Sequence, residues 1–220
     1  MKHSLAQPLT PADFAAATGV SRETMARLEL YDALLLDAAS RMNLIARSTL
    51  EDRWRRHFLD SAQLFPLLGE AGTLVDLGSG AGFPGLVLAA MGAERGLFVT
   101  LVEATKKKAD FLRAAAAEMG LVNLAVIPER IESITISPPD IVTARALARL
   151  EKLLAYAHEI AGQRTRCLFL KGQDVEAELT ETAKSWHTEI SRHPSATSAG
   201  ATILDVRDFA PLRPSRARKA

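Results

Sequence analysis

Hydrophobic and polar residues follow two different patterns along the chain, and the pattern changes near residue 73. Before that point apolar residues recur at helical spacing, for example at Leu28 and Leu35, and no segment alternates as a strand does. Ser21 is suited to cap the longest of these helices. The first part of the chain therefore predicts helices over 11–17, from 22 to about 42, and over 49–65.

After residue 73 short apolar runs alternate with helical stretches. The runs predict strands at 74–77, 97–102, 124–127, 140–143, 167–170, 186–190 and 202–206. The stretches between them predict helices at 84–91, 106–119 (capped by Thr105), 149–161 and 174–184. Repeated strand–helix units predict an α/β fold with a doubly wound, mostly parallel seven-stranded sheet. The last two strands predict an antiparallel hairpin at the edge of this sheet.

This change of pattern also predicts the domain organisation. We expect an N-terminal helical extension over residues 1–70 and a cofactor-binding α/β domain over residues 71–210. Residues 211–220 are rich in Arg and Lys and predict a basic, flexible tail.

The most informative segment is the turn after the first predicted strand. This strand carries Asp76, and four glycines then fall within eight residues, at 78, 80, 82 and 85. Glycines permit tight turning and let a ligand approach the main chain closely. Strand, glycine-rich turn and helix in this order indicate a site for a nucleotide-type cofactor.

Two cofactor classes fit this turn. Gly80, Gly82 and Gly85 satisfy the dinucleotide pattern G-x-G-x-x-G, and Glu103 follows at the expected distance of about 20 residues. The charge of Asp76, however, would repel a pyrophosphate and suits a cationic ligand. S-adenosyl-L-methionine carries a sulfonium and an amino group and no phosphate, and Glu103 could accept both of its ribose hydroxyls. A turn without any ligand is the third interpretation.

Charged residues follow several other predicted strands. Because ligands bind at the carboxyl ends of parallel strands, we expect Glu103, the segment 130–132, Arg145 and Lys171 to converge on one edge. The cations Arg145 and Lys171 suit an anionic substrate such as RNA, and we predict that they position it. Alternatively or in addition, Arg145 forms a structural ion pair with an acid such as Glu132 or Asp76.

Two basic clusters have two interpretations each. The first contains Arg53, Arg55 and Arg56, and the second contains Lys106–Lys108 in the first turn of a helix, where cations oppose the helix dipole. Either cluster could contact phosphate or form an ordinary solvated face. His57 could be functional or could pack and cap a helix.

Composition and remaining motifs limit the function classes. The formal net charge is +1, and the one cysteine, Cys167, begins a predicted strand and is expected in the core. We expect no disulfide, no metal site, no membrane span and a cytoplasmic protein. The segment 137–140 resembles an Asp-Pro-Pro-Tyr signature only superficially, because it precedes its strand, and it predicts a turn. We take a monomer as the default state.

Several motifs together carry a resemblance to a known family. They are Asn43-Leu44, the run Arg-His-Phe-Leu-Asp-Ser at 56–61, the glycine turn through Phe83-Pro84-Gly85, Val102-Glu103, Ala144-Arg145-Ala146 and Leu170-Lys171-Gly172. This combination resembles the glucose-inhibited division protein B family of bacterial 16S rRNA guanine-N7 methyltransferases. The region around Asn43 departs from the family in lacking the usual Trp and Thr.

The resemblance implies a Rossmann-like class I methyltransferase fold with S-adenosyl-L-methionine as cofactor. It implies N7 of a guanosine in 16S rRNA or the small ribosomal subunit as target, with no role for DNA. Taken together with the glycine turn, it implies cofactor-binding residues at Asp76, Gly78, Ser79, Gly80, Gly82, Phe83, Glu103, Arg130, Ile131, Glu132 and Arg145. It also implies that Arg130, Arg145 and Lys171 are polar residues that line the pocket.

The expected chemistry follows from the methyl acceptor, guanine N7, and three other functions remain as alternatives. Guanine N7 has a lone pair and no proton, so methyl transfer needs positioning and no general base. A methyltransferase acting on another RNA, a protein or a small molecule is the main alternative. An NAD-dependent oxidoreductase and a non-catalytic RNA-binding module are the others.

Overall fold

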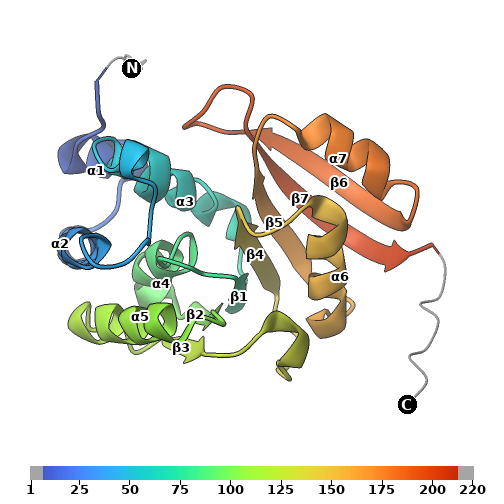
Figure 1. Cartoon of the computed structure of the whole chain (residues 1–220), viewed down its shortest axis with the longest axis horizontal. Coiled ribbons are helices and arrows are strands. Elements are labelled where there is room, and N and C mark those ends of the chain that lie inside the picture. Colours follow the sequence, from blue (N-terminus) through green and yellow to red (C-terminus); the bar gives the residue numbers. More distant parts are fainter. Residues whose placement is uncertain (1–6, 213–220) are drawn as a thin grey trace.

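A seven-stranded sheet forms the centre of the molecule (Figure 1), whose computed structural model describes residues 7–212. The strand order is β3-β2-β1-β4-β5-β7-β6, in which β7 runs antiparallel to both of its neighbours and the other pairs are parallel. The strands are β1 (Thr73–Leu77), β2 (Phe98–Val102), β3 (Leu124–Ile127), β4 (Ile141–Arg145), β5 (Arg166–Lys171), β6 (Trp186–Pro194) and β7 (Thr202–Pro211). The predicted mostly parallel sheet with an antiparallel edge hairpin is confirmed.

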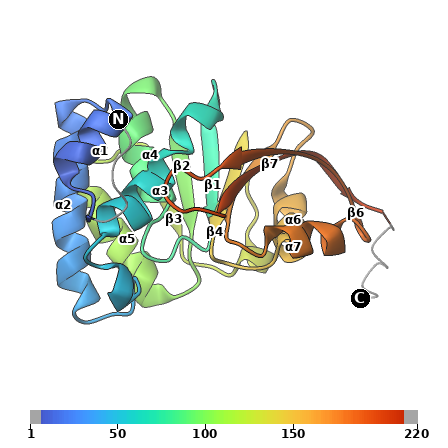
Figure 2. The ribbon, with the colours of Figure 1, turned by 90° about the horizontal axis from the view of Figure 1, so that it is seen from above.

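Helices cover both faces of the sheet. They are α1 (Pro11–Thr18), α2 (Arg22–Ala39), α3 (Asp60–Ala62), α4 (Gly85–Gly92), α5 (Lys106–Glu118), α6 (Leu150–Ile160) and α7 (Val175–Thr182). Helices α4 and α5 pack on one face and α6 and α7 on the other, and α2 lies outside α4 and α5 (Figure 2). Parallel strands buried in this way are apolar along most of their length, as in β1 and β4.

The N-terminal helices share a core with the sheet. Phe14, Tyr31 and Phe58 are fully buried in the same apolar cluster as Leu86 of α4 and Leu101 of β2. The predicted division at residue 70 therefore separates helices from sheet in sequence, while their side chains pack together. Of the predicted basic tail, residues 213–220 lie outside the described part of the chain.

One predicted helix is confirmed only in its middle. Of residues 49–65, the segment 53–62 is continuously helical, with a π-helical turn at Trp54–Leu59 followed by α3, and 3₁₀ turns at Arg47–Thr49 and Phe65–Leu68 flank it. Trp54 and Phe58 stack within the π-helical turn with ring centroids 4.2 Å apart. Burial of these large rings accompanies the wider turn, a form often found at functional sites.

Of the two predicted helix caps, the one at Ser21 is confirmed and the one at Thr105 is wrong. The hydroxyl of Ser21 accepts a hydrogen bond from the Thr24 amide at 3.2 Å, as a cap of α2 should. Thr105 precedes α5, but its side chain makes no capping bond. Its amide donates instead to the carboxylate of Glu103 at 2.7 Å.

Candidate functional site

The glycine-rich turn between β1 and α4 requires its glycines for two different reasons. Gly78 has φ +65°, and a Cβ atom there would lie 2.6 Å from Leu147 Cδ1. A Cβ atom on Gly85 would collide with Leu101 and with the carboxylate of Asp76. The glycines thus serve the backbone conformation and the close packing of α4 on the sheet.

A cavity of about 450 Å³ opens above this turn, at the carboxyl edge of the sheet. Its walls come from the turn, the end of β2, the segment after β3 and the end of β4. The predicted cofactor-binding residues that line it are Gly78, Ser79, Gly80, Phe83, Glu103, Arg130, Ile131, Glu132 and Arg145. We call this space the glycine-turn cavity. Of the predicted residues, Asp76 and Gly82 do not line it.

Glu103 is a fixed negative charge in the glycine-turn cavity. Its two carboxylate oxygens accept hydrogen bonds from the amides of Gly80 at 2.9 Å and Thr105 at 2.7 Å. The side chain is held in place, and each oxygen retains a lone pair for a further donor. Hydroxyl or ammonium donors of a ligand fit this carboxylate, whereas a pyrophosphate would be repelled by it.

Asp76 is placed differently from the prediction that it faces the cofactor. The residue is fully buried beneath the turn, where it accepts hydrogen bonds from the Thr143 hydroxyl at 2.8 Å and from the Gly85 amide at 3.3 Å. Burial raises the pKa of this carboxyl to about 6, although the hydrogen bond from Thr143 opposes the shift. Asp76 therefore supports the turn from below. Its side chain accepts hydrogen bonds from β4 and α4 and links both of them to β1.

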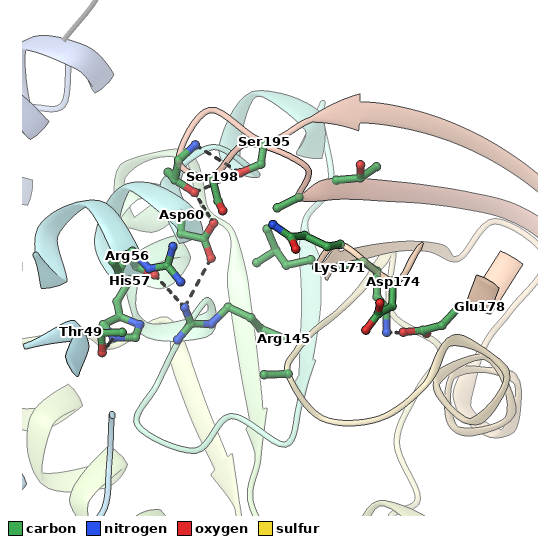
Figure 3. Close-up of a pocket in the computed structure, with 17 residues that line it drawn as sticks. Thr49, Arg56, His57, Asp60, Arg145, Lys171, Asp174, Glu178, Ser195 and Ser198 are labelled. Carbon is green, nitrogen blue, oxygen red and sulfur yellow. Dashed lines mark hydrogen bonds and ion pairs between the residues drawn. The ribbon is translucent and has the colours of Figure 1, made fainter. Parts of the chain in front are cut away.

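A second cavity, of about 410 Å³, adjoins the first, and Figure 3 shows the residues that line it. The π-helical turn contributes Arg56 and His57 to its lining, the sheet contributes Arg145 and Lys171, and further residues come from α7 and from the loop 195–201 between β6 and β7. We call it the acceptor cavity. Arg145 and Ala146 line both cavities, so the two spaces meet at the end of β4.

Arg145 has a different partner from the two expected ones. Its Nη1 atom lies 3.4 Å from the carboxylate of Asp60 and 3.1 Å from the carbonyl oxygen of Arg56, and its guanidinium lies over the ring of Phe83. Arg145 therefore does form an ion pair with an acid, but that acid is Asp60 and neither Glu132 nor Asp76. Glu132 instead accepts a hydrogen bond from the hydroxyl of Tyr156 at 3.0 Å.

Lys171 is held at the end of β5 by two acceptors. Its ammonium lies 2.7 Å from Glu178 Oε2 and donates to the Ala148 carbonyl at 3.1 Å. Only 8% of its side chain is exposed. Glu178 also accepts from the Leu150 amide at 2.6 Å. The Lys171 charge is therefore balanced within the protein, while one N–H of the ammonium remains for a ligand.

His57 lines the acceptor cavity and packs against Phe83, which lines the glycine-turn cavity. Its Nε2 atom is 2.8 Å from the Thr49 hydroxyl, which itself donates to the Ala46 carbonyl, so the imidazole carries its proton on Nε2. Its ring stacks on Phe83 at a centroid distance of 5.1 Å. Burial and the neighbouring cations Arg145 and Arg56 lower its pKa to about 3. His57 is thus a neutral packing group and an unsuitable general base.

The first basic cluster does not form one phosphate-binding surface. Arg53 is paired with Asp32 at 2.5 Å, and Arg55 is paired with Asp52 at 2.9 Å and is largely buried. Arg56 alone of this cluster lines the acceptor cavity.

The second basic cluster lies on the surface. Lys106 pairs with Asp110 at 3.1 Å, and Lys108 lines the glycine-turn cavity. This cluster therefore lies beside the glycine-turn cavity.

Sequence reasoning missed three parts of the acceptor cavity: Asp60, Glu178 and the loop 195–201. Asp60 belongs to the Arg-His-Phe-Leu-Asp-Ser motif, but its contacts with Arg145 and Thr197 cross 85 and 137 positions of sequence. No local pattern reports contacts at such a distance. Cys167, in contrast, lies buried in β5 as predicted.

Across residues 7–212, His, Cys, Asp and Glu side chains form no group of three that could hold a metal ion. In the same range, no helix is both long and apolar enough to cross a bilayer. The segment 137–140 lies at the opposite edge of the sheet, where Asp140 accepts hydrogen bonds from the Gly72 and Thr73 amides.

Comparison with known proteins gives one consistent family. Residues 24–205 match a family model described as GidB, rRNA small subunit methyltransferase G. The chain is 48% identical over 199 residues to ribosomal RNA small subunit methyltransferase G of Paramagnetospirillum magneticum, covering 90% of this chain and 95% of that protein. It is 48% identical over 201 residues to the protein of the same name from Rhodospirillum centenum, covering 90% and 91%.

Solved structures share the fold at low sequence identity. A SAM-dependent methyltransferase from Aquifex aeolicus superposes with a TM-score of 0.56 at 15% identity, covering 71% of this chain and 93% of that one. A ribosomal protein L11 methylase from Lactobacillus delbrueckii gives a TM-score of 0.52 at 16% identity, covering 67% and 75%. At these identities the likeness concerns the arrangement of sheet and helices.

Proposed function

The chain belongs to the rRNA small subunit methyltransferase G family, and on that premise we propose that it transfers a methyl group from S-adenosyl-L-methionine to a guanosine of 16S rRNA. The observation that carries the proposal is the meeting of two cavities at Arg145 and Ala146. One cavity suits the cofactor and the other suits an acceptor, so donor and acceptor would be held next to each other at this point.

The residues that line the glycine-turn cavity match the chemical groups of S-adenosyl-L-methionine. Glu103 offers carboxylate lone pairs to hydroxyl or ammonium donors, and Ile131 and Phe83 offer apolar surface. We propose that these residues, with Gly78, Ser79, Gly80, Arg130, Glu132 and Arg145, bind the cofactor. Asp76 and Gly82 would support it through the shape of the turn. When bound, the cofactor supplies a methyl group on a positively charged sulfur.

The acceptor cavity supports N7 of guanine as the methylated atom. N7 carries a lone pair and no proton, so its reaction needs no general base. In agreement with this, His57 is neutral and a very weak base, and two of the three carboxylates that line the cavity, those of Asp60 and Glu178, are held in ion pairs, while Asp174 is the third. Arg145 and Lys171 would donate to phosphate or to O6 and thereby place N7 in line with the methyl group.

Partners and organisation complete the proposal. We propose that the protein acts as a monomer in the cytoplasm, on RNA and not on DNA or a membrane. Residues 1–70 would serve as a helical extension of the cofactor-binding domain 71–210.

Methyl transfer to RNA tests this function directly. The protein would be incubated with isotopically labelled S-adenosyl-L-methionine and either naked 16S rRNA or small subunits from a strain that lacks the activity. We expect labelled 7-methylguanosine on nucleoside analysis by mass spectrometry. Label in another methylated nucleoside would contradict the N7 assignment, and label only in ribosomal protein would contradict the RNA substrate.

A further inference from the structure

The loop 195–201 between β6 and β7 is a wall of the acceptor cavity that depends on a distant anchor. Ser195, Thr197 and Ser198 line the cavity (Figure 3). The Ala196 amide donates to Gln63 Oε1 at 2.8 Å, and the Thr197 hydroxyl donates to Asp60 Oδ1 at 2.7 Å. The tip of an edge hairpin is thus tied to the helical segment 60–63.

Asp60 joins this loop to the residue that both cavities share. Its Oδ1 accepts from Thr197 and also from Gln63 Nε2 at 2.9 Å, while its Oδ2 faces Arg145 Nη1 at 3.4 Å. The exposed fractions of the Arg145 and Asp60 side chains are 19% and 18%. One carboxylate therefore contacts the loop on one side and Arg145 on the other.

The contacts on the two sides of this carboxylate differ in length. The bonds to Thr197 and Gln63 are short, whereas the contact with Arg145 lies at the long end of hydrogen-bond distances. If a substrate group withdraws Arg145, Asp60 keeps two neutral donors and is not left as an unpaired carboxylate. Arg145 is accordingly the exchangeable partner, and the loop is the permanent one.

We propose that Asp60 is a positioning residue for methyl transfer. It fastens the loop 195–201 as a wall of the acceptor cavity, and it holds Arg145 at the junction of the two cavities until the RNA acceptor engages the guanidinium. This inference rests on the proposed function, because it assigns the second cavity to the RNA acceptor.

Two near-isosteric substitutions separate the two sides of Asp60. Thr197→Val removes the bond that fastens the loop and leaves the carboxylate beside Arg145. We expect the KM for RNA to rise about 3- to 10-fold, the usual effect of one hydrogen bond, with an unchanged rate at saturation. Asp60→Asn keeps an acceptor for Thr197 and loses the charge facing Arg145. We expect the saturating single-turnover rate to fall about 10-fold or more with little change in KM.

Two more variants serve as controls. Asp60→Glu restores the carboxylate and should recover part of the rate, and Asp208→Asn makes the same chemical change at a side chain that is 81% exposed on β7. Asp208→Asn should leave both constants unchanged. Thermal melting of each variant checks that the fold is intact. The separate roles would be overturned if Thr197→Val and Asp60→Asn raised the KM for RNA and lowered the single-turnover rate to the same extent.

A measurement without RNA distinguishes failure of this inference from failure of the proposed function. Hydrogen exchange of the Ala196 amide should accelerate in Thr197→Val and Asp60→Ala, and should stay slow in Asp208→Asn. Unchanged exchange in both of the first two variants would overturn the anchoring role. A wild-type protein that methylates no RNA would overturn the proposed function, while the exchange result would still decide whether Asp60 anchors the loop.

Discussion

At the scale of single residues, Glu103 is the side chain whose role is easiest to isolate. Its carboxylate is fixed by the Gly80 and Thr105 amides and faces the proposed cofactor. Glu103→Gln keeps the size of the side chain but loses the charge and one of the two oxygens that accept from the Gly80 and Thr105 amides. We expect the affinity for S-adenosyl-L-methionine to fall by about 1–3 kcal/mol, as for the removal of a charge-assisted bond. Calorimetry measures this decrease, and Glu118→Gln at the exposed end of α5 is the matched control.

An unchanged affinity in Glu103→Gln would remove Glu103 from the cofactor site. A lower melting temperature with unchanged affinity would leave it only the role of holding the turn. The control should bind like the wild type, because Glu118 lies outside both cavities.

Lys171 and Arg145 should respond differently to truncation. Lys171 lines only the acceptor cavity, so Lys171→Ala should retain cofactor affinity and lower the single-turnover rate about 100-fold through misplacement of the acceptor. Arg145 lines both cavities, so Arg145→Ala should weaken cofactor binding and transfer together. Lys184→Ala, an exposed lysine paired with Glu181, is the matched control for the first variant.

Two results would contradict these assignments. Full activity in Lys171→Ala would exclude a positioning role for Lys171. Intact cofactor affinity in Arg145→Ala would leave Arg145 a role only on the acceptor side.

Single residues also show what a sequence can predict about a site. Glu103, Arg145 and Lys171 end parallel strands, and that position alone predicts their convergence at one edge of the sheet. Asp76 is the last but one residue of β1, and its side chain lies beneath the turn, between β4 and α4. Its direction depends on the contacts with Thr143 and Gly85, which the sequence does not display.

At the scale of elements, Asp76 links β1, β4 and α4 through a buried carboxyl whose pKa is raised to about 6. The folded state then binds this proton more tightly than the unfolded chain, whose pKa is near 3.8. Its contribution to stability is therefore present below about pH 4 and is lost as the pH rises through 6. We expect Asp76→Asn to abolish this loss, which amounts to about 3 kcal/mol at neutral pH, the free energy of a two-unit pKa shift.

Urea unfolding between pH 4 and 7.5 measures this effect as the difference in unfolding free energy between Asp76→Asn and wild type. Taking the difference cancels the other titrating groups, including His57, whose lowered pKa acts in the opposite direction, since its contribution is lost as the pH falls from about 6.5 to 3. A difference that does not change with pH would contradict the raised pKa of Asp76.

Elements with a regular period are predicted well and elements shaped by tertiary packing are not. The strand β3 has the predicted bounds, β1 differs from its predicted bounds by one residue at one end, and α6 differs by one residue at each end. Residues 49–65 look like one helix because their apolar residues recur at helical spacing. The π-helical turn within them depends on how Trp54 and Phe58 pack against α1 and α2, and such packing overrides the local pattern.

At the scale of the whole molecule, the charge distribution should decide how RNA docks. The formal net charge is only +1, so affinity for RNA has to come from local cations. Lys106–Lys108 begin α5 at the carboxyl edge of the sheet, where both cavities open. Arg95, Arg164 and Lys184 are exposed cations in segments that precede strands at the opposite edge. The two sets therefore offer equal charge on opposite ends of the molecule.

We predict that the two sets differ in the salt dependence of RNA binding. Removing one cation that neutralises an RNA phosphate should flatten the slope of log K against log salt by about 0.7–0.9. Neutralising Lys106–Lys108 to Gln should therefore flatten the slope by about 2–3, while the same change at Arg95, Arg164 and Lys184 should leave it unaltered. Binding of 16S rRNA between 50 and 300 mM salt, about the range over which counterion release is usually followed, measures both slopes. Equal slopes in the two triple variants would mean that the Lys106–Lys108 cluster is an ordinary solvated face and that RNA approaches the cavities from another side.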